Sequence, residues 1–187
     1  RDYAQATIDL ARERGADLGA LAAASSGQGG ADQVLPDDLR ADAYVRFLDA
    51  AAAQIGDPLF GLHVGQRMGP STWSGYSTVL RTCPTFRHAA AQTQRFESLA
   101  HDLGRTELRE EGISACMIWH SPWEKRPEGR HLVESVTSSV RQFTDWLAGF
   151  RVPVFEFGFA HDRPADIPQD AYDTLLGAPV RFGAGAN

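Results

Sequence analysis

The sequence predicts an α+β fold in which helices come first and pack on a small, mainly antiparallel sheet. Two observations support this prediction. Through most of the first hundred residues, apolar side chains recur with the 3.6-residue period of amphipathic helices. Beyond His101 the pattern changes to the alternation typical of strands, and segments follow in the order β-β-α-β-α-β. We expect one domain over residues 1–187, with residues 1–35 as a loosely packed helical start.

The N-terminal region predicts three helices. Two short ones are expected over residues 3–14 and 18–25, and Asp17 is placed to cap the second by accepting hydrogen bonds from its free N–H groups. A third is expected over residues 36–55, where apolar residues recur every four positions. Gly56 is a typical helix end signal.

The stretch over residues 57–99 predicts two further helices joined by a bend. Asp57 can cap the first of them, and Pro58 fits its first turn, where a missing N–H costs nothing. Gly69-Pro70 cannot continue this helix. The first helix is therefore expected to end there.

The expected bend holds Gly75 and two large aromatic residues, Trp73 and Tyr76. A second start signal lies at Thr82, with Pro84 just inside the new helix. One face of that helix carries residues at nearly helical spacing, which are Phe86, Ala90, Thr93 and Leu99 or Ala100.

A β-hairpin is expected over residues 106–120, with Glu111-Gly112 as its tight turn. Successive side chains of a strand point to opposite faces. In the first strand Thr106, Leu108 and Glu110 alternate with Glu107, Arg109 and Glu111. In the second, one face carries Ile113, Ala115, Met117 and Trp119, and the other carries Ser114, Cys116, Ile118 and His120.

The C-terminal part predicts a long helix, a strand, a short helix and a last strand. The long helix is expected over residues 129–149, with a buried stripe of Val133, Val136, Val140, Phe143 and Leu147. A strand over residues 152–160 places Phe155, Phe157 and Phe159 on one side. Pro168 opens the short helix, and residues 179–182 form the last strand.

Composition argues against direct DNA binding by this chain. Its net charge is −6 and its pI about 5.5, so a phosphate backbone would repel it. The two cysteines, Cys83 and Cys116, are too few for a disulfide framework and predict reduced thiols in the cytoplasm. No apolar run approaches the roughly 18 residues of a membrane span, and no signal peptide is visible. We expect no membrane partner.

The six histidines do not predict a metal site, because none forms an H-x-x-x-H or H-x-H pair and no cysteine pair has zinc spacing. We expect no metal, no cofactor and no catalytic residue. The alternative is a small hydrolase or isomerase that uses Cys83, at a helix start where a thiolate is stabilised, or His120.

Aromatic residues predict a pocket for a small organic ligand between the helices and the sheet, since such pockets have apolar walls and a few polar groups. Glu134 and Arg141 lie two turns apart on one side of a helix, where they can bind the amine and the carboxylate of an amino acid. Glu156 is a further candidate polar group of the pocket. For both Glu134 and Glu156 the alternative to ligand binding is exposure to solvent, and Glu156 lies on the face of its strand opposite the phenylalanines. The predicted ligand-binding residues are Trp73, Tyr76, Trp119, His120, Glu134, Arg141 and Phe157.

Three segments together resemble a known family. They are GDPLFGLHVGQRM, WSGYSTVLRTCPTFRHAAAQTQRF and the C-terminal VPVFEFGFAHDRPADIPQDAYDTLLGAPVRF. Their order and spacing are similar to those of the N-terminal effector-binding domain, called arabinose-binding-like, in one branch of the AraC-type transcription regulators. The resemblance extends from about Leu21 to the end of the chain.

The resemblance implies a bacterial, cytoplasmic, homodimeric sensor domain that is not an enzyme. Its small-molecule effector would be an amino acid or a hydrophobic acid. In that family the effector biases how a companion domain with two helix-turn-helix units engages DNA. We expect that DNA-binding domain after residue 187, so this chain reaches DNA only through it. Besides the enzyme, a dimerisation module without a ligand is the other alternative.

Overall fold

The computed structural model describes residues 2–26, 40–69, 72 and 74–187. This part of the chain contains eight α-helices and two small sheets, which confirms the α+β class. The helices are α1 (Asp2–Glu13), α2 (Leu18–Ser26), α3 (Ala41–Ile55), α4 (Phe60–Arg67), α5 (Ser74–Arg81), α6 (Phe86–Ala100), α7 (Arg130–Ala148) and α8 (Gln169–Leu176). The strands are β1 (Arg105–Glu111), β2 (Ser114–His120), β3 (Phe157–Phe159) and β4 (Val180–Phe182), and the 3-10 turn η2 (Pro127–Gly129) precedes α7.

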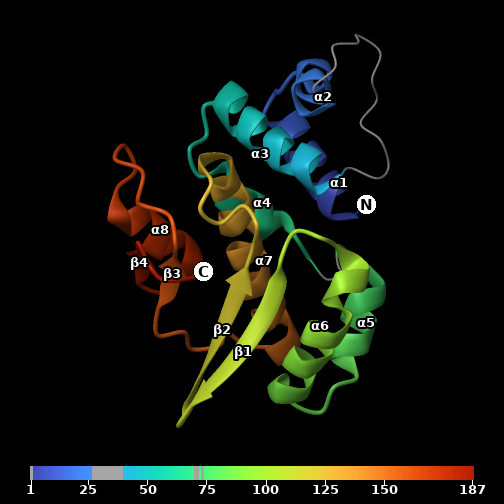
Figure 1. Ribbon diagram of the computed structural model, residues 1–187, viewed down its shortest axis with the longest axis vertical. Coiled ribbons are helices and arrows are strands. Elements are labelled where there is room, and N and C mark those ends of the chain that lie inside the picture. The colour runs from blue at the N-terminus through green and yellow to red at the C-terminus, as the bar shows by residue number, and fades with distance from the viewer. Residues whose placement is uncertain (1, 27–39, 70–71, 73) are drawn as a thin grey trace.

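The elements surround the long helix α7, which runs through the middle of the molecule (Figure 1). Helices α1, α2 and α3 lie together at one end. The hairpin of β1 and β2 extends away from them, with α5 and α6 on one side. The strands β3 and β4 lie with α8 on the other side. The second half of the chain follows the expected β-β-α-β-α-β order.

Local signals predicted several helix ends correctly. Asp17 Oδ1 accepts hydrogen bonds from the backbone N–H groups of Gly19 and Ala20, at 2.9 and 3.1 Å, which confirms the cap of α2. Gly56 ends α3 in the left-handed conformation that favours glycine, with φ of 70°. The predicted start of α3 over residues 36–39 lies outside the described residues.

The predicted bend after α4 is wrong, because α5 occupies it. The sequence did not predict α5 because its serine, glycine and threonine residues have weak helix propensity. Its Leu80 is buried in the structure. The predicted start of the next helix is also wrong. Thr82 Oγ1 donates to the Val79 carbonyl at 2.8 Å and so follows the end of α5. The cap of α6 is Thr85, whose Oγ1 accepts from the His88 N–H at 3.1 Å.

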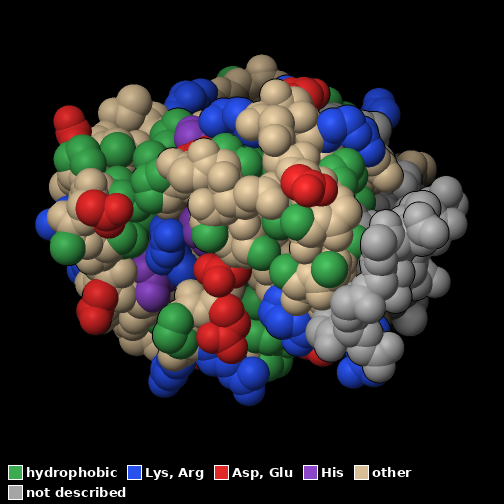
Figure 2. Space-filling model, turned by 90° about the horizontal axis from the view of Figure 1, so that it is seen from above, with side chains coloured by type: hydrophobic (Ala, Val, Ile, Leu, Met, Phe, Trp, Pro, Cys, Tyr) green, Lys and Arg blue, Asp and Glu red, His purple; other side chains and the backbone are tan. Residues whose placement is uncertain are grey.

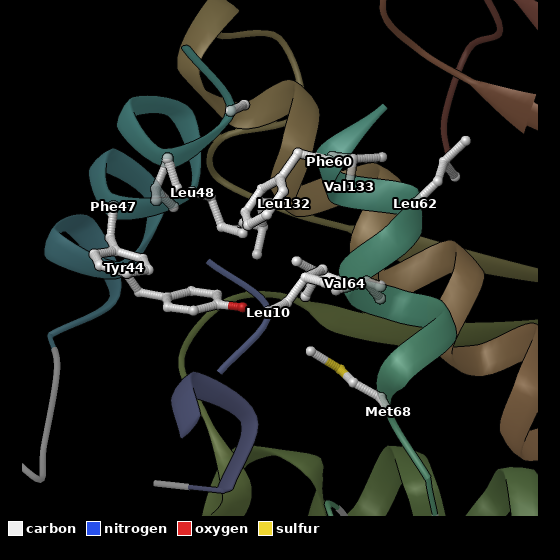
Figure 3. Packing of buried hydrophobic residues seen from close by; sticks show 14 of the residues in the cluster. Leu10, Tyr44, Phe47, Leu48, Phe60, Leu62, Val64, Met68, Leu132 and Val133 are labelled. Carbon is white, nitrogen blue, oxygen red and sulfur yellow. The ribbon is translucent and has the colours of Figure 1, made fainter. Parts of the chain in front are cut away.

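The core lies where α3, α4 and α7 meet α1 (Figure 3). Two glycines of α4 allow its backbone to lie directly against α7. A Cβ atom on Gly61 would stand 2.4 Å from the His131 carbonyl oxygen, and one on Gly65 would stand 2.4 Å from the Ser135 carbonyl oxygen. Fully buried side chains from these helices fill the remaining space, among them Phe47, Leu48, Phe60, Leu62, Val64, Leu132 and Val133.

The hairpin forms as the alternation predicts. Strands β1 and β2 pair antiparallel, and Gly112 turns between them with φ of 62°. The register places Thr106 opposite Trp119, and it places Leu108 opposite Met117. Side chains predicted to share a face within each strand therefore share one face of the whole hairpin. The face with Thr106, Leu108, Met117 and Trp119 is turned toward α6 and α7.

The C-terminal strands depart from the prediction of one mainly antiparallel sheet. They form a second sheet, in which β3 and β4 pair parallel across the connecting helix α8. The strand expected over residues 152–160 is only three residues long, and Phe155 lies outside it with 83 % of its surface exposed, whereas Phe159 is fully buried. Glu156 is exposed and pairs with Arg181 at 2.9 Å.

Across the described residues, every helix is too short or too polar to traverse a lipid bilayer. On the face shown in Figure 2, basic and acidic side chains of the described residues lie interspersed. This face therefore does not present the one-sided basic charge typical of a surface that binds nucleic acid.

Candidate functional site

A cavity of about 480 Å³ lies between the hairpin and the helices α6 and α7. Its volume falls within the range of pockets that hold small organic molecules. The face of β1 and β2 that the alternation predicted provides one wall, and α6 and α7 provide the others. Leu80 of α5, Tyr3 of α1, and His101 and Leu103 between α6 and β1 also line it.

Most of the cavity wall is apolar. The predicted stripe of α7 faces this space, so part of what looked like a core stripe in the sequence borders a cavity. The predicted face of α6 borders the same cavity. The main apolar lining residues are Leu80, Phe86, Ala89, Ala90, Leu103, Leu108, Ile113, Ala115, Met117, Trp119, Val136, Val140, Phe143 and Leu147.

The charged groups of the wall differ in exposure. Arg87 and Glu110 form an ion pair of 2.8 Å, and their side chains are 76 % and 45 % exposed. Glu97, by contrast, is only 6 % exposed. Burial raises the pKa of the Tyr3 hydroxyl to about 12, so this group is neutral and lies 3.3 Å from Ser135 Oγ.

Glu97 joins α6 to the first strand of the hairpin. Its Oε2 accepts a hydrogen bond from the Thr106 backbone N–H at 2.6 Å, and its Oε1 accepts from Thr106 Oγ1 at 2.9 Å. His101, one turn later, also lines the cavity, and burial lowers its pKa. The cavity therefore contains one buried carboxylate beside a neutral imidazole.

Among the predicted ligand-binding residues whose side chains the structure describes, Trp119 alone lines this cavity. Its indole ring packs closely on Gly104, where a Cβ atom would stand 2.5 Å from the ring. The indole Nε1 is buried and has no hydrogen-bond partner among the described residues. It is therefore a free donor in a residue of the cavity wall.

Other predicted ligand-binding residues lie elsewhere. His120 is on the opposite face of the hairpin, where Nε2 lies 2.8 Å from Glu107. Phe157 packs against the core rather than the cavity. Trp73 lies outside the described residues, and Tyr76 belongs to α5 but its side chain is outside what the structure describes. The role of Trp73 and Tyr76 in ligand binding stays a prediction.

Glu134 is fully buried in a polar cluster between α7 and α8, so the alternative of solvent exposure is wrong. The Tyr172 hydroxyl donates to its Oε1 at 2.7 Å, and Arg130 Nη1 donates to the same atom at 3.2 Å. Burial raises the pKa of Glu134 to about 7, although Arg130 and Tyr172 act in the opposite direction. Burial also lowers the pKa of the neighbouring His131 to about 3.

Arg141, also buried, is held by protein groups. Its Nη1 donates to the Val152 carbonyl at 2.7 Å, and its Nη2 pairs with Asp145 at 3.1 Å. Glu134 and Arg141 do not line the cavity described above. The sequence predicted that Glu134 and Arg141 bind one amino-acid ligand together. In the structure, each of the two side chains is paired with groups of the protein.

Two cavity residues, Glu97 and His101, were missed by sequence reasoning. The signal for Glu97 was present, because the face of α6 that carries Phe86, Ala90 and Thr93 continues to position 97 at helical spacing. An acidic residue on that face was a candidate for a buried polar group. His101 follows one turn later, as the C-cap of α6.

The alternative enzyme hypothesis uses Cys83 as a nucleophile. Both cysteines are free thiols, and Cys83 Sγ lies 3.5 Å from the Val79 carbonyl. Within the described part of the chain, no group of three or more His, Cys, Asp or Glu side chains is arranged to hold a metal ion.

The fold and the cavity define a class of protein, an α+β domain with a largely apolar chamber of the size that holds small molecules. The family model described as the arabinose-binding domain of AraC transcription regulator, N-terminal, matches residues 15–187, and the chain belongs to this family. No curated protein matches the sequence. The family is a regulatory, ligand-sensing domain of transcription regulators that bind DNA through a partner domain.

Proposed function

We propose that the cavity between the hairpin, α6 and α7 is the effector site of this regulatory domain. The observation that carries the proposal is the largely apolar lining of a chamber of about 480 Å³. Such a chamber favours a largely apolar effector, because a polar molecule would lose its hydration without finding enough partners. A sugar or a free amino acid fits this wall less well.

Regulation then follows from differential binding. The hairpin and α6 are joined through Glu97 and Thr106, so a ligand that contacts both elements can favour one arrangement of the domain over another. An effector shifts an equilibrium only by the difference between its affinities for the two states. The companion DNA-binding domain would respond to that shift.

The domain extent, the oligomeric state and the cellular compartment belong to the same proposal. We propose one effector-binding and dimerisation domain over residues 1–187, acting as a homodimer in the bacterial cytoplasm. The net charge of −6 supports contact with DNA through the partner domain rather than through this chain. Sedimentation equilibrium tests the homodimer, and a monomer at micromolar concentration would contradict it.

Thermal-shift screening against apolar alcohols, acids and amines tests the effector site. A ligand at about 100 times its dissociation constant stabilises the folded state by about 2.7 kcal/mol. Val140→Phe puts a ring into the cavity and is expected to abolish the shift. Val79→Phe is the matched control, because Val79 is exposed on α5 and does not line the cavity. Equal ligand shifts in both variants would contradict the proposal.

A further inference from the structure

The inner wall of the cavity holds a hydrogen-bond acceptor and a hydrogen-bond donor close together. Glu97 and His101 both line the cavity, and Glu97 Oε1 lies 3.8 Å from His101 Nε2. That separation is too long for a hydrogen bond between the two atoms. Each atom therefore retains capacity to bind a third group.

The tautomer of His101 follows from its contacts. The backbone N–H of Leu103 donates to Nδ1 at 3.3 Å, so Nδ1 presents its lone pair and Nε2 carries the proton of the neutral ring. Burial lowers the pKa of His101, which keeps the ring neutral near pH 7. Within the described part of the chain, the Nε2–H group has no acceptor at hydrogen-bond distance.

Glu97 retains acceptor capacity as well. Thr106 supplies its two hydrogen bonds, one from the backbone N–H and one from Oγ1. A carboxylate offers about four lone-pair positions, so Oε1 can accept a further bond. No lysine or arginine pairs with Glu97 in the part of the chain that the structure describes, and the charge is not neutralised by a cation there.

We propose that the effector carries a neutral hydroxyl group that binds between Glu97 and His101, with its apolar remainder in the rest of the cavity. A hydroxyl group can donate to Glu97 and accept from His101, whereas neither a carboxylate nor an ammonium group does both. This inference rests on the function proposed above and specifies the chemistry of its ligand.

Two charged alternatives fit this wall less well. A carboxylate cannot donate a hydrogen bond, and it would place a second negative charge beside the buried Glu97, where repulsion is stronger than in bulk water. The arginine of the cavity wall, Arg87, is largely exposed and already paired with Glu110. An ammonium group would pair with Glu97 but has no lone pair for the N–H group of His101.

The test compares three ligands with the same alkyl chain, 1-octanol, octanoate and octylammonium, by isothermal titration calorimetry at pH 7.5. Octanol is expected to bind the wild-type domain at least ten-fold more tightly than octanoate. Glu97→Gln removes the charge and is expected to reduce this preference to less than three-fold. His101→Asn keeps an acceptor for the Leu103 N–H but removes the Nε2–H donor, and it is expected to weaken octanol binding about ten-fold.

One control accompanies the test. Glu156→Gln removes an exposed acid outside the cavity and should leave all three affinities unchanged. Octanoate binding as tightly as octanol to the wild type, or an unchanged preference in the folded Glu97→Gln variant, would overturn the inference while leaving the effector site in place. Failure of all three ligands to bind the wild-type domain would count against the effector site itself, and so against both proposals.

Discussion

Replacing Glu134 with glutamine is expected to change how the stability of the domain depends on pH. Glu134 is fully buried, and burial raises its pKa from 4.5 to about 7. The ring nitrogen Nε2 of His161 faces it at 3.8 Å. His161 Nδ1 donates to the Asp162 carbonyl, and burial lowers the pKa of His161, so Nε2 presents a lone pair rather than a positive charge to the carboxyl group.

The sign of the effect follows from proton binding. Between pH 4.5 and 7 the folded chain holds a proton on Glu134 that the unfolded chain has released. The stability that this group contributes is therefore fully present below pH 4.5 and is lost as the pH rises through 7. The loss is about 1.4 kcal/mol per pH unit, or about 3 kcal/mol over the whole window.

His131 acts in the opposite direction. Burial lowers its pKa from 6.5 to about 3, so its contribution to the free energy of unfolding is present above pH 6.5 and is lost as the pH falls through 3. The two slopes oppose each other between pH 4.5 and 6.5 in the wild type. Both proteins contain His131, so its contribution cancels when the free energy of unfolding of the wild type is subtracted from that of the Glu134→Gln variant. The contribution of Glu134 remains.

Urea unfolding followed by circular dichroism, at four pH values from 4.5 to 7.5, measures this difference. The free energy of unfolding of the variant minus that of the wild type is expected to rise by about 1.4 kcal/mol per pH unit up to pH 7. A difference that stays constant over this range would refute the reasoning, because Glu134 would then be ionised throughout in the folded state.

Three further predictions concern local structure, and urea unfolding measures each of them. Gly65→Ala is expected to lower the free energy of unfolding by about 2–3 kcal/mol, because its Cβ would stand 2.4 Å from the Ser135 carbonyl oxygen. Gly69→Ala is the control and should cost less than about 1 kcal/mol, because a Cβ atom at Gly69 has no neighbouring atom within 4 Å. Equal effects of the two would contradict the close packing of α4 on α7. Thr85→Ala should cost about 1 kcal/mol through loss of the α6 cap, and no loss would contradict that cap. Gly149→Ala should cost about 1 kcal/mol because φ is 75° there, and a neutral result would contradict that conformation.

Periodicity predicted which faces of the elements point inward, but not what they surround. The faces of the hairpin and of α7 were correct, yet the stripe containing Val136, Val140 and Leu147 was interpreted as packed core. A residue that borders a cavity and one that touches a neighbouring side chain have the same spacing in the sequence. Of the described residues predicted to bind the ligand, Phe157 packs against the core, whereas Trp119 lines the cavity between the hairpin, α6 and α7.

Other differences came from contacts between distant parts of the chain. The burial of Glu134 depends on Tyr172, which lies 38 residues later and closes the cluster from α8. Alternation placed Phe155 with Phe159, but pairing with the short β4 limits β3 to three residues and leaves Phe155 exposed. Tertiary contacts of this kind leave no local signal in the sequence.

The central claim is that the effector occupies the cavity between the hairpin, α6 and α7. Methyl-resolved NMR of the domain titrated with 1-octanol tests it most directly. The account predicts saturable shifts at Met117, Val136 and Val140, which line the cavity, and none at the core residues Leu48 and Val64. Saturable shifts at Leu48 and Val64 without any at the cavity methyl groups would contradict it.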